Sequence, residues 1–244
     1  MIKSEKTILI VGHRGASSVS PENTLKAFQK AIELKGDYVE FDVQETRDGN
    51  LVVTHDEDIK RITGKDGLIK DMTLNELRKL DFGDGEKIPT LQELVEMTKN
   101  KIGLNCEIKV EGITEKVVQV FREYDIIDTT LVSSFIHEEL LKIQKLEPSL
   151  KLASLEPTPG TIKIDWDKKK EMIQYCIDNN LYAINPLVMM VDQQFVDFAH
   201  ANDVKVFPWT VDSKVSIKKL IRLGVDGIIT NNISRTKEIL KSFS

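Results

Sequence analysis

The chain has 244 residues, of which 41% are hydrophobic and 30% are charged, and its formal net charge at pH 7 is -5. These values are typical of a folded globular protein and exclude collagenous, disordered and membrane-embedded chains. No nucleic-acid partner is expected, because that interaction requires a basic surface. An acidic protein that acts on an anion must gather positive charge locally, from a few side chains or from a bound metal ion.

The length predicts a single domain over residues 1–244, since an α/β barrel commonly has about 250 residues. The first apolar run, Ile8 to Val11, is shorter than the core of a signal peptide, which predicts a cytoplasmic protein. No run of about 18 apolar residues occurs, so no membrane span is expected. Cys106 and Cys176 lack the spacing of a metal or redox motif and are predicted to be buried free thiols.

Short β-rich runs recur along the chain, with helical patterns between them. The predicted strands cover residues 7–11, 37–43, 101–109, 129–134, 150–155, 181–185, 204–211 and 225–230. Apolar residues repeat at three and four positions in the intervals, which predicts helices over 23–34, 114–124, 168–179 and 213–223. This alternation predicts an α/β fold, a (β/α)8 TIM barrel. An open doubly wound sheet is the alternative, but no G-x-G-x-x-G follows the first strand.

The interval between the second and third predicted strands is too long for a single crossover helix. It starts with a hairpin strand over 49–56, after an Asp-Gly turn signal. Two helix starts follow, at Thr73 and Thr90, and each has a glutamate three residues later that completes a capping box. The second start predicts the crossover helix itself. Residues of about 56–88 are therefore predicted to form a small inserted subdomain after strand 2.

Two predicted strands carry polar residues at alternate positions. Glu40 and Asp42 share one face of the second strand, and Asn105, Glu107 and Lys109 share one face of the third. Helices cover the outside of a barrel, so the polar faces are expected to line the lumen. Buried carboxylates cost several kcal/mol each unless they are paired or bind a metal. The cluster predicts a hard divalent cation, Ca²⁺ or Mg²⁺, and a salt-bridge network with Lys109 is the alternative.

His13 and Arg14 follow the first strand, at the carboxyl-terminal rim where the active sites of barrels are built. Arg14 supplies planar cationic donors for a phosphate, and His13 supplies a proton-transfer group near neutral pH. His55 ends the predicted hairpin strand, and alternation carries it to the same rim. Two histidines that face one metal-anchored phosphate would provide a general base and a general acid.

Short motifs surround these residues: "HRG" after the first strand, "PENT" at the first helix, "EFD" in the second strand, "HD" at the hairpin and "EIK" in the third strand. Together they resemble the glycerophosphodiester phosphodiesterase family. The resemblance continues through "IPTLQEL", "SSF", "WTV" and "GVDGIIT" and covers nearly the whole chain. It implies a metal-dependent TIM-barrel hydrolase that converts glycerophosphodiesters, such as glycerophosphocholine and glycerophosphoethanolamine, to sn-glycerol 3-phosphate and an alcohol.

The resemblance also implies a role for each matching residue, and a mechanism in which the glycerol 2-hydroxyl attacks first and water opens the resulting cyclic phosphate. The matching positions are Glu40, Asp42 and Glu107 for the metal, His13 and His55 for proton transfer, Arg14 and Lys109 for the phosphate, and Glu22 and Trp209 for the rest of the substrate pocket. Which histidine is the base, which of the two ions is bound and which alcohol is preferred stay open.

One position departs from the family: Asn231 stands where an aspartate is common, so the details of the eighth-strand rim stay open. The apolar loop 186–191 is predicted to pack on the next helix, or else to face the alcohol group or a partner chain, so a homodimer also stays open. A lysophospholipase D-type or cyclising phospholipase reaction on lipids is the nearest rival. A catalytically silent barrel that binds phosphometabolites is disfavoured, because no histidine or metal carboxylate is missing.

Overall fold

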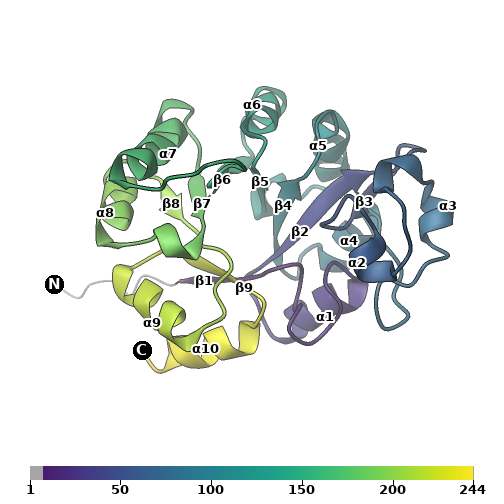
Figure 1. Ribbon diagram of the computed structural model, residues 1–244, viewed down its shortest axis with the longest axis horizontal. Helices are drawn as coiled ribbons and strands as arrows, with labels where there is room; N and C mark the ends of the chain where they lie inside the picture. Colours follow the sequence, from purple (N-terminus) through teal and green to yellow (C-terminus); the bar gives the residue numbers. More distant parts are fainter. Residues whose placement is uncertain (1–7, 244) are drawn as a thin grey trace.

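The computed structural model describes residues 8–243 and contains a barrel of parallel strands inside a ring of helices (Figure 1). β1 (Leu9–Gly12) pairs with β2 (Tyr38–Glu45) on one side and with β9 (Gly227–Thr230) on the other. From β2 the parallel order continues through β4 (Gly103–Ile108), β5 (Thr130–Ser134), β6 (Lys151–Glu156), β7 (Ala183–Pro186) and β8 (Lys205–Val206). The TIM-barrel prediction is confirmed.

The barrel closes through an irregular segment after β8. The N–H groups of Asp226 and Ile229 donate to the carbonyl oxygens of Val206 and Pro208, each at 3.0 Å. The predicted strand over 204–211 is therefore too long, because Pro208 has no N–H with which to continue a regular ladder. The other predicted barrel strands are present with ends shifted by a residue or two, and residue 7 lies outside the described part. The hairpin strand predicted over 49–56 is shorter and covers Leu51–Val53.

Helices fill the crossovers and cover the outer face of the strands (Figure 1). N-cap side chains begin six of them, at Thr24, Thr90, Asp165, Asp192, Ser213 and Asn232. The crossover elements are α1 (Leu25–Glu33), α4 (Leu91–Thr98), α5 (Thr114–Glu123), η2 (Ile127–Thr129), α6 (His137–Leu146), α7 (Trp166–Asp178), η3 (Val188–Met190), α8 (Gln193–Ala201) and α9 (Lys214–Leu223), and α10 (Ile233–Lys241) follows the last strand. Within residues 8–243 none of the helices has the length and apolarity that a membrane crossing requires.

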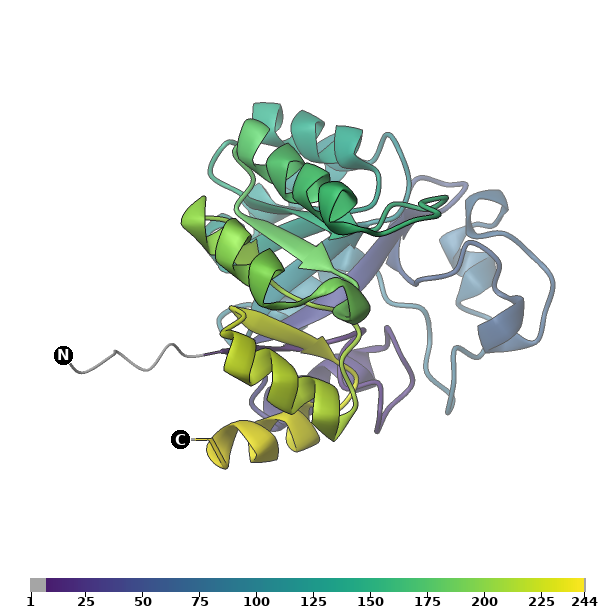
Figure 2. The same ribbon diagram turned by 60° about the vertical axis from the view of Figure 1, so that its left-hand side comes forward.

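The segment between β2 and α4 lies outside this ring and projects on the side toward which the strand arrows point (Figure 2). β3 (Leu51–Val53) pairs antiparallel with β2, and α2 (Lys60–Thr63), η1 (Ile69–Asp71) and α3 (Leu74–Leu77) follow. Both predicted capping boxes are present. The segment packs around its own apolar cluster, Val52, Ile59, Ile69, Leu77, Phe82 and Ile88. Its delimitation as a subdomain over about 56–88 stays a prediction.

The lumen changes its chemistry along its length. The part farther from the carboxyl ends of the strands, here called the lower part, is apolar. The residues that fill it are Val11, Leu131, Ala153, Ala183, Phe207 and Ile229. Tyr38 packs against this layer and approaches Gly103 so closely that an added Cβ there would lie 2.5 Å from its ring, which requires glycine. Cys106, in β4, and Cys176, in α7, are buried free thiols, as predicted. The polar residues of the same strands lie above the apolar layer.

Candidate active site

Three carboxylates meet where β2 and β4 end. The parallel register places Asp42 beside Glu107 and Glu40 beside Asn105. The buried side chains of Glu40, Asp42 and Glu107 bring ligand oxygens within 4.8 Å of one another. Burial and the charge of Asp42 raise the pKa of Glu40 well above its usual value and the pKa of Glu107 to about 7. Burial also acts to raise the pKa of Asp42, but the charges of Lys109 and Arg14 outweigh it and lower that pKa.

This carboxylate cluster fits a divalent cation. Oδ1 of Asp42 is buried without a hydrogen-bond partner, and carboxylate oxygens are the ligands that Ca²⁺ and Mg²⁺ prefer. Lys109 donates to Oε1 of Glu107 at 2.7 Å, so the salt bridge with Lys109 that was the alternative to a metal ion does form. The ammonium of Lys109 and the guanidinium of Arg14 do not fully balance three ionised carboxylates, however, and a divalent ion would supply the missing positive charge. Among residues 8–243 this is the only such gathering of three or more acidic, histidine or cysteine ligands.

Arg14 lies across the carboxylates in a strained backbone conformation. Its φ of 54° falls in the left-handed region, which costs a non-glycine residue about 1–2 kcal/mol. The N–H of Arg14 donates to Oε2 of Glu40 at 2.8 Å and thereby holds this conformation. The guanidinium donates from Nη1 to Glu22 at 2.8 Å, and its Nε lies 3.6 Å from Asp42 without a hydrogen-bond partner. The side chain therefore keeps an unused donor at the site.

His13 is held by Asn231, which follows β9. Its Nδ1 lies 2.7 Å from Oδ1 of Asn231, whose Nδ2 donates to Asp212 at 2.6 Å. Because a carboxylate only accepts, Asp212 fixes the orientation of the amide, and Nδ1 of His13 carries the hydrogen. Nε2 then keeps its lone pair, 3.9 Å from Glu40. Burial, followed by the charge of Arg14, lowers the pKa of His13 and favours the neutral imidazole.

His55 follows β3 and is held by a carboxylate instead. Its Nδ1 lies 2.7 Å from Oδ1 of Asp56. Arg61, from α2, donates to Oδ2 of Asp56 at 2.5 Å and to Oε1 of Glu22 at 2.6 Å. The same Glu22 oxygen accepts from Arg14. A chain of ion pairs thus joins His55 to Arg14, and it passes through the segment outside the barrel.

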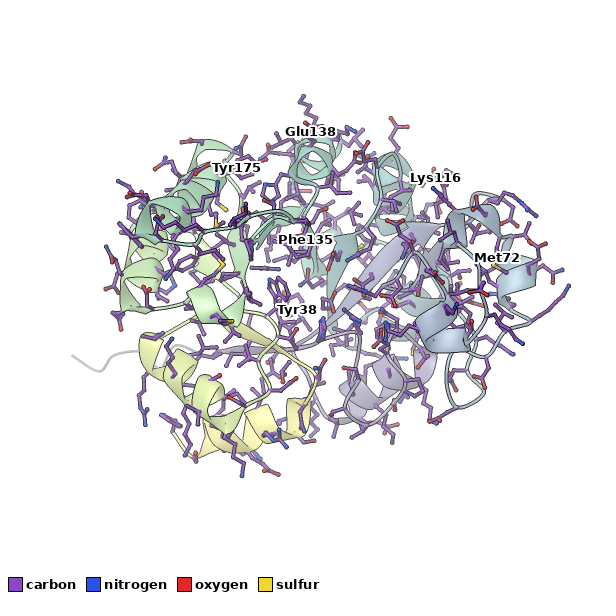
Figure 3. The ribbon with its side chains drawn as sticks, viewed as in Figure 1. Tyr38, Met72, Lys116, Phe135, Glu138 and Tyr175 are labelled. Atoms are coloured by element: carbon purple, nitrogen blue, oxygen red, sulfur yellow. The ribbon has the colours of Figure 1, made fainter. Side chains whose placement is uncertain are left out.

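One cavity of about 50 Å³ at the mouth of the lumen is lined by His13, Arg14, Glu40, His55 and Glu107. Trp209 and Phe135 form its opposite wall, with their rings edge to face at 5.6 Å, and Phe135 lies near the centre of the barrel in Figure 3. The indole Nε1 of Trp209 donates to the carbonyl oxygen of Asn185 at 2.8 Å, which anchors the ring. Lys109, whose Nζ lies 5.9 Å from the centre of the Phe135 ring, also lines a groove of about 590 Å³.

Comparison with known proteins agrees with this geometry. Residues 13–235 match the model of the Glycerophosphoryl diester phosphodiesterase family. The chain belongs to this family and is an enzyme of its type. A glycerophosphodiester phosphodiesterase of Caldanaerobacter subterraneus subsp. tengcongensis is 40% identical over 237 residues, which are 92% of this chain and 94% of that protein. One from Bacillus altitudinis is 35% identical and covers 94% of this chain and 97% of its own length.

Solved structures of the family have the same barrel. A phosphodiesterase of Oleispira antarctica, in complex with the product sn-glycerol-3-phosphate, superposes with a TM-score of 0.84 at 27% identity, over 96% of both chains. A glycerophosphodiester phosphodiesterase of Thermotoga maritima gives a TM-score of 0.81 at 29% identity, over 96% of this chain and 98% of that one. The agreement extends over nearly the full length of each protein.

Sequence reasoning missed several residues of this phosphodiesterase pocket. Asn185 is fully buried, lines the cavity, and has no partner for either amide atom. Strand alternation places it on the lumen face with Ala183, so the sequence does carry a signal for it. Asp212 and Arg61 give no such signal, because each reaches the site from a separate loop or helix. Asn231 attracts notice only as a departure from the family.

Proposed function

We propose that the protein hydrolyses glycerophosphodiesters, such as glycerophosphocholine and glycerophosphoethanolamine, to sn-glycerol 3-phosphate and an alcohol, with a divalent cation and two histidines. One observation carries the proposal: His13, His55 and Arg14 line the same small cavity as two members of the carboxylate cluster, Glu40 and Glu107. Family membership supports the reaction type, and the Oleispira antarctica neighbour holds the proposed product.

The phosphate is bound by cations around the carboxylate cluster. A Ca²⁺ or Mg²⁺ ion held by Glu40, Asp42 and Glu107 would supply Lewis-acid stabilisation of the phosphate oxygens. Arg14 and Lys109 contribute charge-assisted hydrogen bonds, which strengthen as negative charge develops in the transition state. Both cations are already oriented by carboxylates, Arg14 by Glu22 and Lys109 by Glu107, so little side-chain motion is needed on binding.

His13 acts as the general base in the first step. Its Nδ1–H is donated to Asn231, so Nε2 presents a lone pair to the cavity, and burial keeps the ring neutral. This nitrogen takes the proton of the glycerol 2-hydroxyl, whose oxygen attacks phosphorus and forms a cyclic phosphate. In the second step water opens the ring and His13 returns the proton to the 2-oxygen.

His55 acts as the general acid in the first step, in which the alcohol leaves. Asp56 orients the ring through Nδ1 and stabilises an imidazolium, as the acidic member of a catalytic triad does. The imidazolium donates its Nε2 proton to the departing alkoxide, and the neutral ring then takes a proton from the attacking water. Arg61 holds Asp56 and, through Glu22, keeps the acid aligned with the phosphate-binding Arg14.

Asn185 and Trp209 are assigned to the glycerol end of the substrate. An amide with one free donor and one free acceptor matches a hydroxyl group, which offers the complementary pair. The cavity of about 50 Å³ encloses only the reacting part of a diester. The alcohol group extends into the groove of about 590 Å³ that begins at Lys109.

A lysophospholipase D-type reaction is the second candidate, and exposed apolar side chains around the mouth favour it. Val19, Ile162, Met189 and Val215 are 62%, 100%, 83% and 80% exposed. All four lie in loops or helix starts that follow the carboxyl ends of β1, β6, β7 and β8. An apolar rim of this kind fits an acyl chain or a lipid surface.

Product identification with the purified protein tests the proposal. Glycerophosphocholine, glycerophosphoethanolamine and lysophosphatidylcholine are each incubated with Ca²⁺, Mg²⁺ or Mn²⁺, and the products are identified by mass spectrometry. Release of sn-glycerol 3-phosphate from the first two supports the proposed function. Cleavage of the lysolipid alone would favour the second candidate, and no cleavage of any substrate by the folded protein contradicts both. The His13→Ala variant, prepared in parallel, controls for contaminating phosphodiesterases.

A further inference from the structure

A second cavity, of about 350 Å³, lies outside the barrel between α6 and α7. Its inner end is Glu156, the last residue of β6. Neighbouring strand residues face opposite sides, so Leu155 lines the active-site cavity whereas Glu156 faces the helices. His137 from α6 and Tyr175 from α7 stack with ring centres 4.8 Å apart on one wall. In Figure 3 Tyr175 lies between the two helices.

Glu156 is a buried carboxylate that lacks a compensating charge. Its side chain is 4% exposed; Oε2 accepts the N–H of Thr158 at 3.0 Å, and Oε1 accepts no hydrogen bond from the described residues. His137 Nε2 lies 3.6 Å from Oε1 but is directed at the carbonyl oxygen of Leu155, at 3.3 Å. Burial lowers the pKa of His137, so the imidazole is neutral at pH 7 and supplies no positive charge.

The other charged groups of the cavity leave this imbalance in place. Lys168 lies 2.9 Å from Glu171, and its charge offsets only part of the effect of burial on Glu156. Asp178 adds a further negative charge at the cavity wall. Burial raises the pKa of Glu156 to about 7, which is the response of a carboxylate without a counter-ion. The charged side chains of the cavity are therefore more acidic than basic, and its deepest carboxylate, Glu156, which is ionised in about half of the molecules at pH 7, has no ion pair with a lysine or arginine among the described residues.

We propose that this cavity binds a small organic ammonium ion, of the choline or ethanolamine class, with Glu156 as the counter-ion. Its volume lies within the range of about 300–1,000 Å³ that is usual for small-molecule sites. Met172 and the rings of His137 and Tyr175 offer the apolar and aromatic surface that alkylammonium groups favour. A metal ion fits less well, because no close group of three metal-ligating side chains occurs here among residues 8–243.

The inference does not rest on the proposed function, because the cavity and the active site lie on opposite faces of β6. If that function holds, the ligand class includes the alcohols that the reaction releases. A separate binding measurement therefore fails or succeeds independently of the activity assay.

Calorimetric titration of the substrate-free protein with choline and with tetramethylammonium tests the proposal. The neutral isostere 3,3-dimethylbutan-1-ol serves as the ligand control. Glu156→Gln keeps the shape of the site and removes its charge, and Glu138→Gln removes the same charge from the exposed face of α6, outside the cavity (Figure 3). We expect saturable binding of the cations in the millimolar range or tighter. Glu156→Gln is expected to weaken it about tenfold or more, and Glu138→Gln by less than about twofold.

Two results would overturn the proposal: cation and isostere bind equally, or Glu156→Gln retains the wild-type affinity. Absence of saturable cation binding to the folded wild-type protein would also overturn it. Tyr175→Leu, which removes the aromatic wall but no charge, provides a second variant in case Glu156→Gln does not fold, and it is expected to weaken cation binding as well. Unchanged affinity in that variant would count against the site.

Discussion

The lower and upper halves of the lumen are built by the same strands yet differ in chemistry. β1 carries Val11 in the lower layer and continues to His13 in the upper one, and β9 continues from Ile229 to Asn231. The lower layer is apolar. The upper layer holds three clustered carboxylates and the unpartnered amide of Asn185. The comparison indicates that the lower half stabilises the fold, whereas the upper half retains unfavourable groups for which a ligand is the natural partner.

The largest effect is expected on the rate of catalysis, from substitutions in the upper half of the lumen. His13→Ala and His55→Ala should each lower kcat about 10²–10⁴-fold, which is the usual contribution of an acid–base group. Neither histidine fills the apolar layer, so thermal unfolding should be nearly unchanged. Steady-state assays and calorimetric unfolding check both statements. If either histidine variant unfolded at a much lower temperature, or kept kcat within about threefold of the wild type, the upper half could not be assigned to catalysis rather than to stability.

In the lower half the same kind of truncation should affect stability instead. Phe207 is 6% exposed and packs in the apolar layer, so Phe207→Ala should lower the free energy of unfolding by about 3–5 kcal/mol. The folded fraction should still cleave substrate at nearly the wild-type rate. Denaturant unfolding and kcat at low temperature provide the two measurements. A loss of kcat as large as in the histidine variants would mean that the halves act as one unit.

Glu156, whose side chain lies on the outer face of β6, predicts a pH effect on stability. Its pKa is raised from about 4.5 to about 7 in the folded state, so the folded protein holds this proton more tightly than the unfolded one. Its contribution is fully present below pH 4.5 and is lost as the pH rises to 7, about 3 kcal/mol in all. His137, whose pKa is lowered, has the opposite dependence, so the comparison must be between variants.

The difference in unfolding free energy between wild type and Glu156→Gln isolates this carboxylate from His137, Lys168 and Glu171. Without organic cations, Glu156→Gln should gain stability relative to wild type from pH 4 to pH 8 by about the same 3 kcal/mol. Glu138→Gln should follow the wild-type curve. Parallel curves for wild type and Glu156→Gln would show that Glu156 titrates at its ordinary pKa.

Asn185 predicts a smaller effect with opposite signs for activity and stability. Asn185→Leu replaces two unpartnered amide atoms by an apolar side chain of similar size, which should leave stability unchanged or raise it by about 1 kcal/mol. It should lower kcat/KM about 10–100-fold, because a substrate hydroxyl loses its partner. Kinetics with glycerophosphocholine and thermal unfolding test this pair. Unchanged kcat/KM would remove Asn185 from the substrate pocket.

Local patterns predict the barrel and the residues on its strands. Alternation places Glu40 and Asp42 on one face and Glu107 on the next strand, and the crossover periodicity predicts the helices between them. The contacts that hold His13 and His55 are not local. Asn231 and Arg61 reach them from distant segments, and no spacing rule links such pairs. Likewise, the burial of Glu156 depends on how α6 and α7 pack, which "SLEP" does not reveal.

The central claim is that the carboxylates of the upper lumen hold a divalent cation on which hydrolysis depends. The most direct measurement is sn-glycerol 3-phosphate release after EDTA treatment and after return of Ca²⁺, Mg²⁺ or Mn²⁺, for wild type and for Asp42→Asn. The account predicts that EDTA abolishes release, that one or more of the ions restores it in the wild type, and that no ion restores it in Asp42→Asn at equal concentration. Full activity in EDTA, or full activity of Asp42→Asn, would contradict it.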